Sequence, residues 1–116
     1  VCGSGADDSR NKLGYRRFLR LNLTAPATLT ITATGAVDGG NASSVAASDP
    51  DIFVHRRGVL VQVGETTTSA PGSSETIDHK LYDAGLYIIE VFDFAFTTGL
   101  SGNANVPHCM TVSVTG

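Results

Sequence analysis

The sequence predicts an all-β fold, an antiparallel, jelly-roll-like β-sandwich of seven to eight strands. The chain of 116 residues contains 13 Thr, 11 Val and 5 Ile, so a quarter of it is β-branched. Straight-chain helix formers are scarce, with 2 Lys, 3 Glu and 1 Gln. Apolar residues alternate with a period of two, and turn signals recur about every 8 to 15 residues, as in sandwiches.

The chain is predicted to form one domain, because its length matches that of a single compact unit. Residues 1–13 are rich in Gly, Ser and Asp, which indicates a linker or an N-terminal extension. The single sandwich domain is expected over residues 14–116. No apolar run approaches the roughly 20 residues of a membrane-spanning helix, so we expect no membrane span.

Two strands are predicted in the first third of the chain. Three leucines alternate with polar residues over 19–23, which is typical of a half-buried strand. Tyr15 and Phe18 interrupt this alternation and predict a bulge near residues 16–17. The second strand, residues 28–34, reads TLTITAT, with its aliphatic residues facing inward and its threonines facing outward.

A hairpin is predicted in the middle of the chain, between two long loops. Residues 35–49 and 64–74 are polar, small and without sustained periodicity, which indicates loops. Between them, strands over 51–55 and 59–63 are separated by a short turn. Gly58 in that turn is suited to a positive φ angle.

Three more strands are predicted over 75–81, 86–96 and 108–115. Alternation in the first of these places three residues on one face, namely Ile77, His79 and Leu81.

A row of phenylalanines follows from the alternation in residues 86–96. If the inward face carries Tyr87, Ile89 and Val91, the opposite face carries Phe92, Phe94 and Phe96. An exposed aromatic row is a candidate binding surface for a partner or polymer, or the interface of a homodimer. The alternative is that a bulge at Asp93, or cover from residues 97–107, makes the row part of the core.

Cys2 and Cys109 are the only cysteines and are predicted to form a disulfide bond. The three histidines do not have the spacing that a zinc site with two cysteines requires. A disulfide implies an oxidising compartment, so we expect a secreted, periplasmic or cell-surface protein. Two alternatives stay open: Cys2 is lipidated at the start of a bacterial lipoprotein, or both thiols are buried and unpaired.

The charge distribution argues against a nucleic-acid partner. The net charge is −3, and only residues 1–20 carry a local excess of positive charge. The sequence pI of about 5.4 lacks the basic footprint of nucleic-acid-binding domains. We expect the arginines to pair with carboxylates on neighbouring strands instead.

No catalytic residues are predicted. The chain has no Gly-x-Ser-x-Gly elbow of a serine hydrolase, and it has no tryptophan that could stack on a sugar beside the paired carboxylates of a glycosidase. Asp49 and Asp51 lie on one side of an extended segment and are expected to accept backbone N–H bonds there. Together with Asp7 and Asp8 they are candidate calcium ligands, since calcium takes oxygen ligands from acidic loops. No other cofactor is expected.

Two segments resemble the bacterial pre-peptidase C-terminal domain family: SDPDIFVHRRGVLV over 48–61 and YDAGLYIIEVFDF over 82–94. By that resemblance, Asp49 and Asp51 match the acidic pair of the family, and Ala84–Gly85 match its turn. Residues 15–35 are similar to the early strands of the family, so the likeness covers about 100 residues. His55 and Arg56 depart from the family pattern, and residues 97–107 look like an insertion.

The resemblance implies a sandwich appended to secreted bacterial enzymes, often proteases, that usually lacks catalysis itself. We therefore expect a non-catalytic accessory domain of a secreted bacterial protein. It would be appended to an extracellular hydrolase and serve localisation, maturation or stability. The alternative is a polysaccharide- or protein-polymer-binding module that uses the aromatic face of Phe92, Phe94 and Phe96.

Overall fold

The computed structural model describes residues 16–36, 49–65, 74–93 and 109–116, and these form seven β-strands and no helix. The all-β prediction is therefore confirmed. No helix in these ranges is long and apolar enough to cross a membrane. The strands are β1 (Arg16–Leu23), β2 (Ala27–Ala36), β3 (Pro50–Arg56), β4 (Val59–Val63), β5 (Glu75–Tyr82), β6 (Gly85–Asp93) and β7 (Cys109–Thr115).

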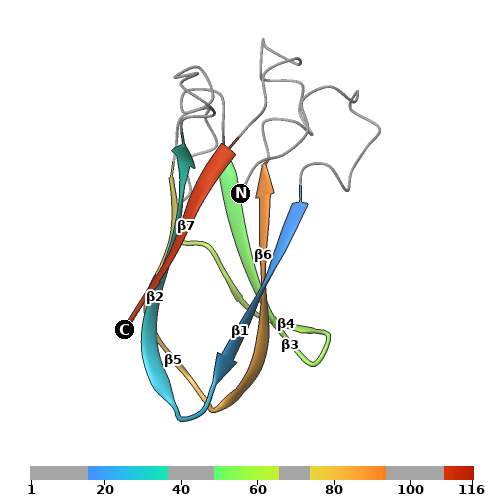
Figure 1. Cartoon of the computed structure of the whole chain (residues 1–116), viewed down its shortest axis with the longest axis vertical. Helices are drawn as coiled ribbons and strands as arrows, with labels where there is room; N and C mark the ends of the chain where they lie inside the picture. The colour runs from blue at the N-terminus through green and yellow to red at the C-terminus, as the bar shows by residue number, and fades with distance from the viewer. Residues whose placement is uncertain (1–15, 37–48, 66–73, 94–108) are drawn as a thin grey trace.

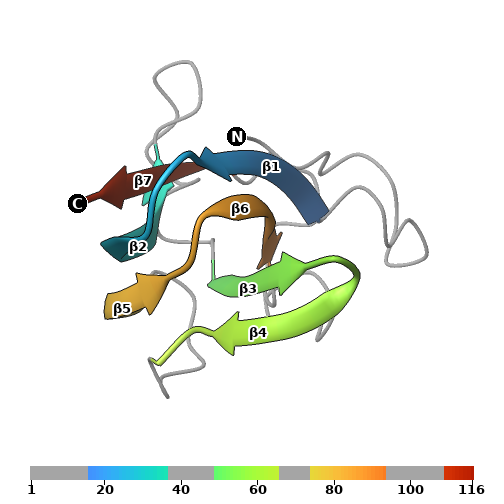
Figure 2. The same cartoon turned by 90° about the horizontal axis from the view of Figure 1, so that it is seen from below.

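The strands form two antiparallel sheets that pack as a sandwich (Figures 1 and 2). One sheet has the order β1-β6-β3-β4 and the other has the order β5-β2-β7. Only the β3–β4 connection stays within one sheet, and the other five pass from one sheet to the other. Sheet neighbours are therefore mostly far apart in the sequence.

β1 pairs with β6 without a break, from Arg16 opposite Phe92 to Leu23 opposite Gly85. The predicted alternation of leucines is confirmed, because Leu19 and its two neighbours on that face pack against the core. The bulge predicted near residues 16–17 is wrong for the described part of β1. Phe18 continues the alternation on the outer face instead of breaking it.

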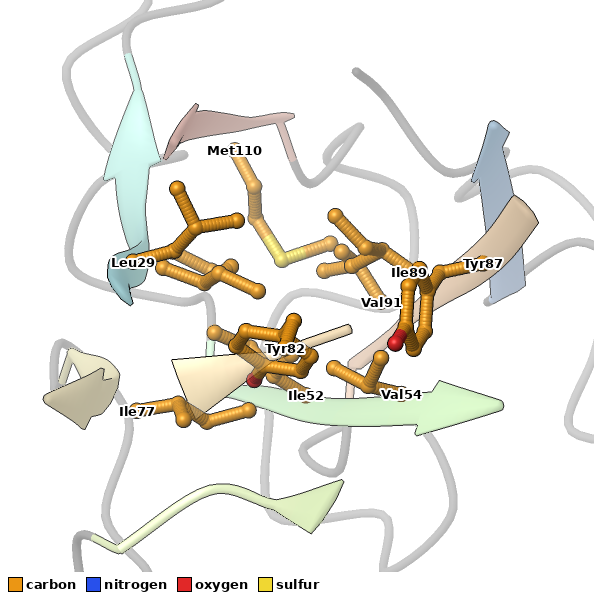
Figure 3. Packing of buried hydrophobic residues seen from close by; sticks show 11 residues of the cluster. Leu29, Ile52, Val54, Ile77, Tyr82, Tyr87, Ile89, Val91 and Met110 are labelled. Atoms are coloured by element: carbon orange, nitrogen blue, oxygen red, sulfur yellow. The ribbon is translucent and has the colours of Figure 1, made fainter. Parts of the chain in front are cut away.

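The core lies between the two sheets (Figure 3). One sheet contributes alternate residues of β3 and β6, which confirms the inward face predicted for Tyr87, Ile89 and Val91. The other sheet contributes residues of β2, β5 and β7. The buried core side chains are Leu29, Ile31, Ala33, Ile52, Val54, Ile77, Tyr82, Tyr87, Ile89, Val91 and Met110.

The predicted hairpin joins β3 to β4 through a two-residue turn. Arg57 and Gly58 have φ angles of 51° and 75°. Two consecutive positive φ angles are the mark of a type I′ turn, whose twist matches that of the flanking strands. The prediction of a positive φ at Gly58 is confirmed.

β5 contains a bulge opposite Thr30 that changes which residues face inward. The register with β2 shifts there, and His79 has a φ of 47°. The prediction that Ile77, His79 and Leu81 share one face is therefore correct for Ile77, which is buried, but wrong for the other two, which lie after the register shift. Leu81 is 72% exposed, whereas its neighbour Tyr82 is buried in the core.

β4 forms an apolar edge of the four-stranded sheet. Its sequence VLVQV has no charged residue, and the exposed fractions of Val59, Leu60, Val61 and Val63 range from 44% to 62%. Edge strands in soluble proteins are usually protected by charges, prolines or bulges. The residues of β4 include no charge and no proline, but β4 has a bulge: Val54 pairs with Gln62 and His55 with Leu60, so Val61 is the extra residue.

Candidate binding face on the four-stranded sheet

The outer face of the four-stranded sheet carries two aromatic rings on either side of a buried carboxylate. Phe18 of β1 and Phe53 of β3 both pair with Glu90 of β6, from opposite sides. Directly opposite residues of antiparallel strands point to the same face, so all three lie on the face away from the core. Strand spacing separates the two phenylalanine Cα atoms by about 10 Å. Phe18 is 57% exposed and Phe53 is partly buried.

Glu90 is the centre of an ionic network on this face, although only 8% of it is exposed. Its Oε1 accepts a hydrogen bond from the Nη1 group of Arg16, and its Oε2 lies 2.9 Å from Nε2 of His55. A carboxylate only accepts, so Nε2 carries the proton in this contact. Arg16 and His55 thus hold Glu90 from both neighbouring strands. For Arg16, the predicted pairing of an arginine with a cross-strand carboxylate is confirmed.

Phe92 lies on the same face but is not exposed. The guanidinium carbon of Arg16 lies 4.2 Å from the centre of the Phe92 ring, which is a cation–π contact. With 7% of Phe92 exposed, the predicted exposed row is wrong at this residue. Phe94 and Phe96 lie outside the described residues, so their part of the row stays a prediction.

Four carboxylates gather where β3 begins and β6 ends. Burial, together with the negative charges of Asp49, Glu75 and Asp93, raises the pKa of Asp51 to about 6. The backbone N–H of Asp49 donates to Oδ1 of Asp93 at 3.1 Å. Of the four, Asp49, Glu75 and Asp93 are nearly completely buried, and Asp51 is partly exposed.

The structure describes only two of the four predicted calcium ligands, Asp49 and Asp51. Asp7 and Asp8 lie outside the described residues. Among the residues that are described, no group of three or more His, Cys, Asp or Glu side chains is arranged to hold a metal ion. Calcium binding by Asp49 and Asp51 therefore stays an expectation from the sequence.

Cys109 is the first residue of β7 and is 3% exposed. Its thiol is not free. Its predicted partner Cys2 lies outside the described residues, so the Cys2–Cys109 bond stays a prediction.

Comparison of the chain with models of known families, with curated proteins and with solved structures finds no match. The resemblance to the pre-peptidase C-terminal domain thus stays a prediction from the sequence.

Sequence reasoning missed the constellation of Arg16, Phe18, Phe53, His55 and Glu90. One signal was available in the sequence. Glu90 is the only charged residue in the apolar run LYIIEVF, and the alternation of this strand places Glu90 on the outward face. Its partners could not be read from the sequence, because Arg16 and His55 lie 74 and 35 residues away. Only the pairing of β1 and β3 with β6 brings them together.

The arrangement provides the elements of a binding surface. Two rings offer flat apolar contact area, and the charged groups between them offer hydrogen-bond donors and acceptors. All five side chains stand on paired strands, which hold them more precisely than loops would. Hydrogen bonds from Arg16 and His55 fix the position of the Glu90 carboxylate between the rings.

Proposed function

We propose that this chain is a non-catalytic accessory module of a secreted protein that binds an extended polymer on the outer face of its four-stranded sheet. The accessory role appended to an extracellular hydrolase rests on the sequence resemblance. The polymer-binding role rests on one observation, the pair of rings at Phe18 and Phe53 that flank the Arg16–Glu90–His55 network.

The open face of a sheet suits a linear polymer better than a small molecule, which usually binds in an enclosed cavity. Rings on separate strands can contact successive units of one chain, while charged groups between them bond polar substituents. Phe18 and Phe53 take the place of Phe92 as the aromatic contact residues, because Phe92 is buried and the Arg16 guanidinium lies over its ring.

Binding to insoluble polysaccharides and to protein polymers tests the proposal. The protein is mixed with cellulose, chitin, pectin gel or gelatin, and the fraction that sediments with each polymer is measured. We expect saturable binding to at least one of them and at least a tenfold weaker affinity for Phe18→Ser, because a central aromatic contact is lost.

Leu81→Ser is the matched control. Leu81 is also a large exposed apolar residue, but it belongs to the other sheet. It should leave polymer binding unchanged. The proposal fails if the protein sediments with none of the polymers, or if both variants weaken binding equally.

A further inference from the structure

A pocket of about 490 Å³ lies at one end of the four-stranded sheet and is lined by residues of both the β3–β4 and the β5–β6 turns. Leu86 and Ile88 of β6 line it, and both lie on the outward alternation that also carries Glu90. Arg57 of the β3–β4 turn lines it as well. The pocket thus continues the binding face described above, and its volume lies within the range of about 300–1,000 Å³ that is usual for ligand pockets.

Two exposed arginines without a partner flank this end of the face. Arg20 of β1 lies directly opposite Ile88, so its side chain stands on the same outer face. Arg57 lines the pocket from the turn. Neither Arg20 nor Arg57 has a hydrogen bond or an ion pair with any residue that the structure describes. Both guanidinium groups are therefore available to an anion from outside the chain.

The other charged groups near the pocket are already balanced. Arg56 also lines the pocket, but its Nη2 group donates to the carbonyl of Ala84 at 2.9 Å, and its Nη1 group lies 3.6 Å from the carboxylate of Asp83. The charge of Glu90 is used within its own network. Asp51 lies at the other end of the face, where β3 begins. The excess of positive charge at the pocket therefore comes from the two unpaired arginines.

The backbone of Arg57 has a conformation that an arginine rarely adopts. Its φ angle is 51°, and that of Gly58 is 75°. Type I′ turns favour glycine, asparagine and aspartate at such positions, because other side chains are strained there. Strained residues of this kind gather at sites where ligands bind. A cation thus stands where the turn alone would favour a small residue.

We propose that the polymer bound on this face is an acidic polysaccharide, whose carboxylates bond Arg20 and Arg57 while its sugar rings stack on the two phenylalanines. This inference rests on the proposed function and specifies the class of polymer. Charge complementarity supports it, because a guanidinium group can bond a carboxylate through two parallel hydrogen bonds. Leu86, which is 43% exposed, adds apolar surface beside these cations.

An acidic peptide fits this face less well than a sugar chain does. β6 and β3 each lie between two neighbours in the sheet, so their backbone groups are already used in pairing. The face therefore offers side chains and no row of free backbone groups. An extended peptide has an N–H and a C=O group at each residue, and these need partners when they are buried. A polysaccharide backbone has no such groups.

Titration calorimetry on the full chain tests the proposal with three probes. These are galacturonate oligomers, the methyl esters of the same oligomers, which lack the charge, and oligoglutamate, which is an acidic peptide. We expect saturable binding of the acidic sugar that is at least tenfold tighter than binding of its ester. Its affinity should fall clearly when the ionic strength rises from about 0.01 M to about 0.15 M.

The other outcomes overturn this inference and are distinguishable from failure of the proposed function. Equal binding of the acidic sugar and its ester shows a polymer-binding face that does not select for charge. Tighter binding of oligoglutamate makes the partner an acidic peptide. If none of the three probes binds, the inference is wrong, whereas the proposed function still stands if the protein sediments with a neutral polymer and Phe18→Ser prevents this.

Arg20→Gln and Arg57→Asn each remove one unpaired cation. Each should weaken binding of the acidic sugar severalfold and leave binding of the ester unchanged. Arg57→Asn also places a favoured residue in the turn, so its melting temperature should stay the same or rise. A loss of binding in this variant is then not a loss of folding. If Arg57→Asn binds the acidic sugar as tightly as the parent chain does, the proposal is wrong.

Lys80→Gln is the matched control for charge. Lys80 belongs to β5 in the other sheet, and its Nζ lies 2.6 Å from the carboxylate of Glu65. The change lowers the net charge of the chain by the same amount as the two arginine changes, but it should leave binding of the acidic sugar unchanged. If Lys80→Gln weakens binding as much as they do, net charge alone attracts the polymer, which contradicts the proposal.

Discussion

The side-chain oxygen of Thr30 on β2 accepts a hydrogen bond from the backbone N–H of His79 on β5 at 3.2 Å, and the same hydroxyl donates to the carboxylate of Asp78 at 3.0 Å. One side chain thus satisfies both residues of the β5 bulge. The bulge leaves backbone groups that the regular ladder does not pair, and Thr30 replaces one of those bonds.

Replacing Thr30 with Val should lower the free energy of unfolding by about 1–2 kcal/mol, because two hydrogen bonds are lost at unchanged shape. Urea denaturation measures the change. Thr32→Val, two residues along the same outward face, removes a hydroxyl with no such role and should change stability by less than about 0.5 kcal/mol. Equal effects would show that the bulge does not depend on Thr30.

Replacing Glu90 with Gln should lower the free energy of unfolding by about 2–4 kcal/mol, because Arg16 and His55 lose their shared charged partner in a partly buried site. Asp83→Asn breaks a longer and mostly exposed ion pair with Arg56. This change should lower the free energy of unfolding by less than about 1 kcal/mol. Thermal denaturation of both variants compares them. A smaller loss for Glu90→Gln than for Asp83→Asn would contradict the central role of the network.

Stability should rise as the pH falls from 7 toward 5, through the raised pKa of Asp51. The folded-state pKa of about 6 exceeds the ordinary value of 3.8, so the folded state binds the proton more tightly than the unfolded state. The charged Asp51 carboxylate therefore destabilises the folded state above pH 6, and this destabilisation is lost as the pH falls toward 4 and the carboxylate takes up a proton. Because Asp51 is partly exposed, we expect about 1 kcal/mol rather than the full value.

Asp51→Asn isolates this effect from those of the neighbouring carboxylates. The variant should be more stable than the parent chain at pH 7 and about equally stable at pH 4. Denaturation series at both pH values measure the difference. A variant that is less stable at pH 7 would show that the Asp51 carboxylate has a favourable partner.

The uncharged edge strand β4 should allow two copies of the chain to associate at high concentration, as a homodimer with paired edges. Sedimentation measurements over a concentration series detect this. Val61→Lys places a charge at the centre of the edge and should weaken association at least tenfold. Val114→Lys introduces the same charge at an exposed position on β7, in the other sheet, and should not. If both variants self-associate as strongly as the parent chain does, the interface lies elsewhere on the protein.

The predicted Cys2–Cys109 bond can be checked by mass alone. Alkylation without reductant should leave the intact mass unchanged, and alkylation after reduction should add two alkyl groups. Uptake of two groups without reduction would refute the bond. Loss of the bond should lower stability by about 2–5 kcal/mol, since removing a native disulfide from a small domain has this effect.

Local patterns in the sequence predicted the strands but not their partners. Period-two alternation correctly placed Leu19 and Ile89 inward, because the two faces of a strand follow from backbone geometry alone. The bulge at His79 was not predictable, since it arises where β5 meets Thr30 on another strand. The network around Glu90 was missed for the same reason: its members meet only through long-range pairing.

The connections that cross between the sheets also affect how the protein is made. β1 has a single sheet neighbour, β6, and β2 lies between β5 and the last strand, β7. At about 5 to 20 residues per second, the ribosome needs about 4 to 14 s to add the residues between the end of β1 and the end of β6. During that time the leucines of β1 lack their cover. The emerging chain thus exposes the leucines of β1 until β6 has been synthesised, and chaperones have that interval in which to bind it.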